Sequence, residues 1–275
     1  ISMEWTEKGP IRATLRIERK FLRSTIVQDI RFYAHSRNID FETWVDWKQH
    51  QVLLKAEFDV DINANEATYD IQFGNLSRPT HANTMWDVAK FEVCAHKWAD
   101  LSETGYGVAI LNDCKYGHSI RDGHMTLTLL KSGVVPNPVT DQEEHSFTYS
   151  LLPHLGGWRE GGVVPAAYAL NIPVRQAVVS KAGKGLSQSY VTVDSAAVAL
   201  ETVKEALDGK GTILRLYEYQ NSRTKVTIAL GEEAAEVWDC DLMENCLEKL
   251  PTDGHSFTVT VKPYEIRTFR VIPKA

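Results

Sequence analysis

Period-two alternation of apolar and charged residues constrains the fold of this chain more than any other feature. Apolar side chains occupy the even positions from Leu54 to Ile62, and lysine, glutamate and aspartate occupy the odd positions between them. Successive side chains of a strand point to opposite faces, so this pattern gives one packed and one wet face, which is typical of antiparallel sheets. Residues 39–48 repeat the pattern, with Trp44 as an exception on the polar side. The sequence therefore predicts a largely antiparallel β structure.

Similar alternation predicts strands elsewhere in the chain. They lie near residues 15–17, 125–129, 145–151, 214–216, 226–230 and 259–261. Residues 195–207 mix alanine and leucine, which favour helices, with valine, which favours strands; we interpret them as mostly strand because both neighbouring segments are β. We expect loops at 63–90, where the alternation lapses, and at 131–141, where two prolines and a glycine prevent regular pairing.

Composition narrows the class of protein. A chain of 275 residues with 43% hydrophobic and 24% charged residues can bury the core of one large or two ordinary domains. The formal charge of -6 is spread along the chain without a lysine and arginine run, which argues against a nucleic-acid partner. No apolar run approaches the roughly 20 residues that span a bilayer, and the first five residues do not resemble a signal peptide. We therefore expect no membrane partner.

Cysteine usage and one glycine-rich segment add two expectations. The four cysteines lack the close spacing of a zinc or redox motif, which suits a reducing cytoplasm, and we expect each to be a small buried residue. The segment 181–185 combines lysine and glycine in the manner of a linker. It predicts a large domain at 1–180 and a smaller one at 186–275.

The stretch 91–118 is the best candidate for a binding site. It is interpreted as a strand, a turn, a second strand and then a polar turn that carries Asn112, Asp113, Lys115, Tyr116 and His118. A rigid support that gathers hydrogen-bonding and aromatic side chains is how small polar ligands such as sugars are held.

Motifs of known enzyme chemistry are absent from the sequence. It has no Gly-x-Ser-x-Gly elbow, no His-Glu-x-x-His, no phosphate-binding loop and no dinucleotide fingerprint. His118 and His124 flank Asp122, but this spacing in a strand and turn does not place the three side chains on one face. The sequence therefore predicts no catalytic residue and no metal ligand in this chain.

Several stretches resemble a known family. They are residues 91–103, 105–109, 111–119, 136–138 with Asp141, 145–151, 213–218 and 263–268. Together they resemble the C-terminal β region of glycoside hydrolase family 38 α-mannosidases, in particular the cytosolic-type and bacterial subgroup, over essentially the whole chain.

The resemblance implies an all-β fold and a fragment of an enzyme. The fold would be a large antiparallel β-sandwich of the supersandwich, galactose-mutarotase-like type, followed by a smaller β-sandwich subdomain. In this family the nucleophile and the ligands of a divalent metal, usually zinc, belong to an N-terminal catalytic domain and a helical segment. The chain would thus be the β portion of a cytoplasmic, retaining exo-α-mannosidase, inactive and without cofactor on its own.

Partners and contact residues also follow from the resemblance. The partners would be the enzyme's own catalytic and helical domains and a mannose-containing oligosaccharide, and self-association is a further expectation because family enzymes often associate. The residues expected at the rim of the sugar pocket are Asp113, Lys115, Tyr116 and His118, followed by His96, Trp98 and Lys131. An aromatic ring can stack on a pyranose while charged neighbours bind its hydroxyls. A core or turn role is the alternative for each residue.

Two other functions stay open at this point. The chain could act as an autonomous, lectin-like carbohydrate-binding module that uses the same loops without catalysis. It could also be a purely structural assembly domain, which would neither bind nor hydrolyse sugars.

Overall fold

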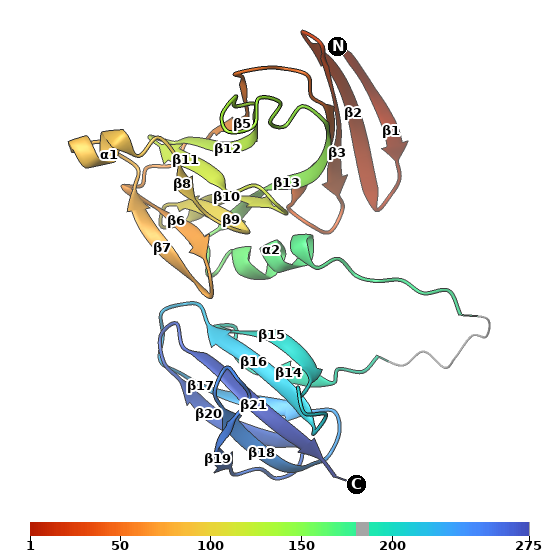
Figure 1. The fold of residues 1–275 in the computed structure, drawn as a ribbon, viewed down its shortest axis with the longest axis vertical. Coiled ribbons are helices and arrows are strands. Elements are labelled where there is room, and N and C mark those ends of the chain that lie inside the picture. Colours follow the sequence, from red (N-terminus) through yellow and green to blue (C-terminus); the bar gives the residue numbers. More distant parts are fainter. Residues whose placement is uncertain (180–186, 275) are drawn as a thin grey trace. The chain divides into compact units, whose positions relative to one another are not determined.

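The computed structural model describes residues 1–179 and 187–274 (Figure 1). The chain divides into two compact units, Ile1–Arg175 and Gln176–Ala275. The glycine and lysine segment predicted as a linker, 181–185, lies outside the described residues, so the boundary between 180 and 186 stays a prediction.

Unit 1 contains a nine-stranded antiparallel sheet and a four-stranded one. The larger sheet has the order β1-β2-β3-β4-β13-β10-β9-β6-β7, and the smaller has the order β5-β12-β11-β8. The strands of the larger sheet are β1 (Ser2–Lys8), β2 (Arg12–Phe21), β3 (Ser24–Tyr33), β4 (Ile39–Asp46), β13 (Glu144–Leu155), β10 (Tyr106–Asn112), β9 (Trp98–Ser102), β6 (Glu66–Ile71) and β7 (Gly74–Pro79). Those of the smaller sheet are β5 (Leu53–Asp59), β12 (His124–Lys131), β11 (Gly117–Arg121) and β8 (Val93–Cys94).

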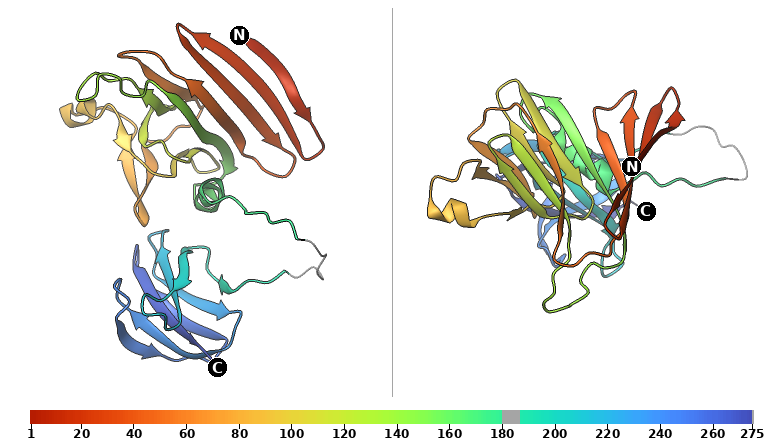
Figure 2. Two further views of the ribbon diagram at one scale, coloured as in Figure 1. Left: turned by 45° about the vertical axis from the view of Figure 1, so that its right-hand side comes forward. Right: turned by 90° about the horizontal axis from the view of Figure 1, so that it is seen from above.

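The two sheets pack face to face around one apolar core (Figures 1 and 2). Val45 and Ile110 come from the larger sheet, Met125 and Leu127 from the smaller, and all four are fully buried. The predicted alternation places them there, because every second residue of each strand faces the opposite sheet. The predicted antiparallel sandwich is confirmed.

The prediction of a loop at residues 63–90 is wrong. This segment forms the hairpin of β6 and β7 and then a short helix, α1 (Met85–Ala89), at whose start the Thr84 hydroxyl accepts a hydrogen bond from the Asp87 N–H. β7 is an edge strand that packs on the core through few of its side chains, so its sequence does not alternate. The loop predicted at 131–141 is confirmed from residue 132 onward.

A second helix, α2 (Val163–Asn171), packs against β9 and β10, and the alternation of the strands gives no sign of it. Beside it, His154 Nε2 lies 2.7 Å from Asp100 Oδ2, and both side chains are fully buried. Two glycines give the imidazole its space. A Cβ on Gly107 would lie 2.3 Å from His154 Cε1, and one on Gly161 would lie 2.3 Å from its Nδ1.

Unit 2 is a smaller sandwich of two antiparallel sheets, also as predicted. One sheet has the order β15-β16-β21-β18-β19 and the other β14-β17-β20. The strands are β14 (Val191–Val193), β15 (Val198–Glu205), β16 (Thr212–Glu218), β17 (Thr224–Leu230), β18 (Ala234–Cys240), β19 (Cys246–Leu250), β20 (Ser256–Val261) and β21 (Ile266–Pro273). β15 confirms the strand interpretation of residues 195–207. The core lies between the sheets and includes Leu216, Ile228 and Phe269.

None of the helices among the described residues has the length and apolar character needed to cross a membrane.

The packing of unit 1 predicts a large difference between two leucine substitutions. Leu127→Ala removes a fully buried side chain from the core and should lower the free energy of unfolding by about 3 kcal/mol. Leu155→Ala changes a side chain that is 67% exposed and should cost less than about 0.5 kcal/mol. Urea titration followed by tryptophan fluorescence measures both, and equal losses would contradict the assigned core.

Candidate functional site

A buried amide organises the polar turn at the end of β10. Asn112 is 1% exposed; its Oδ1 accepts the N–H of Lys115 at 2.7 Å, and its Nδ2 donates to the carbonyl oxygen of His96 at 2.8 Å. The backbone carbonyl oxygen of Asn112 accepts a hydrogen bond from Asn171 Nδ2 of α2 at 2.9 Å. A buried amide must satisfy its donors and acceptors, so these bonds hold the turn, the start of β9 and the helix in one arrangement.

Four predicted contact residues lie on or beside this turn with accessible side chains. Asp113 extends the β10–β13 ladder: its N–H donates to the carbonyl of Thr148 at 3.1 Å, and its Oδ2 accepts the N–H of Thr148 at 2.9 Å. Lys115 Nζ lies 4.4 Å from the ring centre of Phe147. The Tyr116 ring is 55% exposed and its centre lies 5.4 Å from that of His96. The turn thus combines an exposed tyrosine, paired with the half-buried His96, with two opposite charges.

The half-buried Lys97 and the buried Asp70 form an ion pair next to His96 that the sequence interpretation missed. Lys97 donates to Asp70 Oδ2 from its N–H at 2.8 Å, and its Nζ lies 3.2 Å from the same oxygen. Burial raises the pKa of Asp70, while the charge of Lys97 opposes that shift. The ammonium also lies 5.1 Å from the ring centre of Tyr168 on α2. No local motif marks this pair, because Asp70 is brought to Lys97 only by sheet pairing.

Two of the predicted contact residues are buried instead. The Trp98 side chain is buried on the face of β9 that points away from the sandwich core, with its ring centre 5.2 Å from that of Trp158, which precedes α2. His118 is fully buried, and its Nε2 lies 3.5 Å from Asn112 Nδ2. In this structure neither side chain reaches the surface of the turn.

Lys131 is exposed at the end of β12, next to the proline-containing loop. Its N–H donates to Asp141 Oδ2 at 2.9 Å. This bond ties the end of the strand to the loop, whereas the ammonium is left on the surface.

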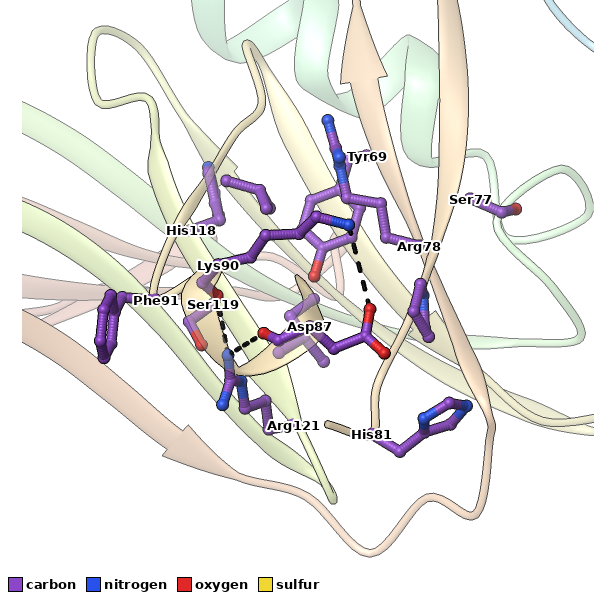
Figure 3. A pocket seen from close by; sticks show the side chains of 13 residues that line it. Tyr69, Ser77, Arg78, His81, Asp87, Lys90, Phe91, His118, Ser119 and Arg121 are labelled. Atoms are coloured by element: carbon purple, nitrogen blue, oxygen red, sulfur yellow. Dashed lines mark hydrogen bonds and ion pairs between the residues drawn. The ribbon is translucent and has the colours of Figure 1, made fainter. Parts of the chain in front are cut away.

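A cavity of about 160 Å³ lies beside the turn, between β7, α1, β8 and β11 (Figure 3). Arg121 Nη2 donates to the carbonyl oxygens of Asp87 at 3.1 Å and of Lys90 at 2.7 Å, which fastens α1 over it. Figure 3 shows the Lys90 side chain extended toward the Asp87 carboxylate, at 3.9 Å. His118 alone among the seven predicted residues lines this cavity.

A second hollow of about 380 Å³ lies on the outer face of the larger sheet and includes Asp113. Cross-strand pairs line it: Arg16 with Asp29 at 2.7 Å, and Arg31 with Glu42. Trp44, the exception to the alternation of β4, also lines it. An aromatic ring among paired planar polar groups is a surface suited to a neutral, hydroxyl-rich ligand.

The described residues do not fit a divalent metal. Across residues 1–179 and 187–274 no three histidine, cysteine, aspartate or glutamate side chains are grouped closely enough to hold one. No chemistry of this chain is therefore assigned to a metal.

The burial of His118 predicts a pH dependence of stability. Burial lowers the pKa of His118 from 6.5 to about 4, so the unfolded chain takes up this proton at higher pH than the folded one. The contribution of the neutral, buried His118 to the free energy of unfolding is complete above about pH 6.5. As the pH falls toward 4, the free energy of unfolding decreases by about 3 kcal/mol. Urea titrations across this range should show a shallower loss for His118→Gln than for the unchanged chain. His35→Gln, an exposed control, should leave the pH profile unchanged.

Two models of known protein families match this chain. The model of the glycosyl hydrolases family 38 C-terminal domain matches residues 1–139, and that of the glycosyl hydrolases family 38 C-terminal beta sandwich domain matches residues 197–269. Each match falls within one of the two units.

Individual proteins named alpha-mannosidases are also similar to this chain. Human alpha-mannosidase 2C1 is 44% identical over 254 residues, which are 90% of this chain and 24% of that protein. Alpha-mannosidase G of Dictyostelium discoideum is 36% identical over 97% of this chain and 26% of its own length. The chain therefore spans about a quarter of the length of these curated relatives. The crystal structure of an alpha-mannosidase from Enterococcus faecalis V583 superposes with a TM-score of 0.82 over 98% of this chain and 35% of that one.

At 17% identity the superposition shows a shared fold. The family model covers more than half of the sequence and confirms the resemblance seen in its motifs. The chain belongs to the C-terminal region of glycosyl hydrolase family 38.

Proposed function

We propose that this chain is the C-terminal, carbohydrate-contacting β portion of a retaining exo-α-mannosidase that releases terminal α-linked mannose. The observation that carries the proposal is the match to two C-terminal family models in a chain that spans about a quarter of relatives named alpha-mannosidases. The nucleophile and a divalent metal, zinc by analogy with the family, would belong to the part of the enzyme outside this chain. The cytosolic-type resemblance supports a cytoplasmic enzyme.

The polar turn would form one part of the sugar-pocket rim. His96 and Tyr116 offer an aromatic surface for a pyranose ring, and Asp113 and Lys115 offer groups for its hydroxyls. Asn112, Trp98 and His118 would hold these side chains in place from beneath, as their burial supports. Lys131, at the end of β12 in the four-stranded sheet, remains a candidate.

The proposed function predicts that the 275-residue chain and the full-length protein differ in mannosidase activity. The 275-residue chain should not hydrolyse an aryl α-mannoside with any added divalent metal, whereas the full-length protein that contains it should do so with a metal bound. Release of the aryl alcohol measures both. Robust metal-dependent hydrolysis by the chain alone would overturn the proposal.

The proposed rim predicts that a substitution at the polar turn weakens substrate binding. In the full-length protein, Tyr116→Ala should raise KM for an aryl α-mannoside by about 3- to 10-fold through the loss of one aromatic contact, about 0.5–1.5 kcal/mol. Tyr106→Ala is the matched control, because Tyr106 is also exposed but starts β10, at the opposite end from the turn. Equal changes in KM for the two variants would exclude the turn from the rim.

An autonomous carbohydrate-binding module is the second candidate, favoured by the hollow that joins Trp44 to Asp113 on the chain itself. Titration of the 275-residue chain with mannose and manno-oligosaccharides separates the two functions. Saturable binding that Trp44→Ala abolishes would support a module that uses this hollow, and negligible binding would support an incomplete enzyme pocket.

A further inference from the structure

Two cysteines of unit 2 face each other across a pair of strands. Cys240 ends β18 and Cys246 begins β19, and the two are register partners. Their Sγ atoms lie 3.8 Å apart. The expectation of four buried thiols is wrong, since Cys94, Cys114 and Cys246 are exposed and only Cys240 is buried. A spacing of five residues between cysteines does not suggest a redox motif, whereas the hairpin brings them together.

The surroundings of this pair give the two sulfurs different chemistry. Cys240 Sγ lies 3.8 Å from Cys246 Sγ and 3.7 Å from the carbonyl oxygen of Trp238, and burial, together with the bond to Cys246, raises the pKa of Cys240 to about 12. Cys240 is buried and Cys246 is exposed, so an oxidant from solvent reaches Cys246 first.

A nearby cation completes the environment. Arg270 on β21 donates to Asp208 Oδ2 at 2.8 Å and to the backbone carbonyl oxygen of Glu244, two residues before Cys246, at 2.9 Å. Reactive cysteines lie in partly exposed surroundings close to a cation, and the exposed Cys246 follows directly on the segment that Arg270 binds.

We propose that Cys240 and Cys246 are a redox modification site that closes to a reversible disulfide when the oxidant is a peroxide. The Cys246 thiolate attacks one peroxide oxygen, the O–O bond breaks, and with hydrogen peroxide one water leaves as Cys246 becomes a sulfenic acid. Cys240 Sγ then attacks Cys246 Sγ, the S–O bond breaks and a second water leaves. Two thiols and one hydrogen peroxide thus give one disulfide and two waters, and a thiol reductant reverses the reaction.

The geometry makes the second step local. A disulfide brings its sulfur atoms to about 2.05 Å, so they must approach by about 1.8 Å. Rotation of the exposed Cys246 side chain supplies such a movement without a change of strand register. The pair lies directly opposite across the ladder, where side chains are neighbours.

Closure would fix an edge of unit 2. β19 is the last strand of its sheet, and the loop before it is folded by Asp241, whose Oδ1 accepts the N–H groups of Met243 and Asn245 at 2.9 Å. Glu244 in that loop reaches Lys204 Nζ at 2.6 Å and the N–H of Leu207 at 2.8 Å. A disulfide would thus restrain β19 together with the loop that holds the turn after β15.

The test uses the whole chain carrying Cys94→Ser and Cys114→Ser, so that only the pair remains. After treatment with hydrogen peroxide, a protease that cuts after glutamate separates the two cysteines at Glu244. The expected result is that the Cys240 and Cys246 peptides stay joined in mass spectrometry, separate on reduction, and that the melting temperature of the oxidised, uncut protein rises by a few degrees.

Single variants test the assigned roles. With Cys240→Ser added, peroxide should carry Cys246 on to sulfinic acid, because no thiol resolves the sulfenic acid. With Cys246→Ser added, the buried Cys240 should be alkylated far more slowly than Cys246 is in the Cys240→Ser variant. Circular dichroism checks that each variant is folded. Separate peptides after oxidation, or equal alkylation rates, would overturn the proposal.

Discussion

The arrangement of the polar turn depends on one buried asparagine. Asn112 is buried where β10 leaves the sheet; its side-chain amide bonds Lys115 in the turn and His96 before β9, and its backbone carbonyl oxygen accepts a hydrogen bond from Asn171 on α2. A buried polar group without a partner costs free energy, so each segment must stay where it satisfies Asn112. The exposed residues of the turn are consequently presented by the core of the sandwich and not by a free loop.

Much of the fold could be predicted from sequence, because alternation is a local signal of a strand with one packed face. β4, β5 and β15 all lie where the pattern placed them. The order of the strands could not be predicted in this way: β13 pairs with β4 and with β10, and nothing within β13 encodes those partners. β7 and α1 escaped detection because short, exposed elements carry little apolar periodicity.

The candidate site divides in the same way. The sequence locates the polar turn, since charged and aromatic residues follow a strand there, but it does not say which side chains remain outside. His118 alternates with half-buried neighbours on β11, and the burial of its ring is decided by the larger sheet packed opposite. Trp98 packs against Trp158 in the segment before α2, and the strand pattern did not predict that contact. Trp44 gives the reverse case, because its unusual position on the polar side of β4 matches an outward hollow that it shares with Asp113.

The two glycines around His154 have a consequence for how this protein can vary. The His154 imidazole fills the space beside Gly107 and Gly161. Even a methyl group at either glycine would overlap the ring. Gly107 lies at the far end of β10 from the exposed turn, and Gly161 lies just before α2. Helix α2 carries Asn171, which donates to the backbone carbonyl oxygen of Asn112. A small side chain added at either glycine would act as a wedge. Its effect would pass through a displaced helix to Asn112 and the polar turn, so a substitution could disturb the turn from a position that does not contact it.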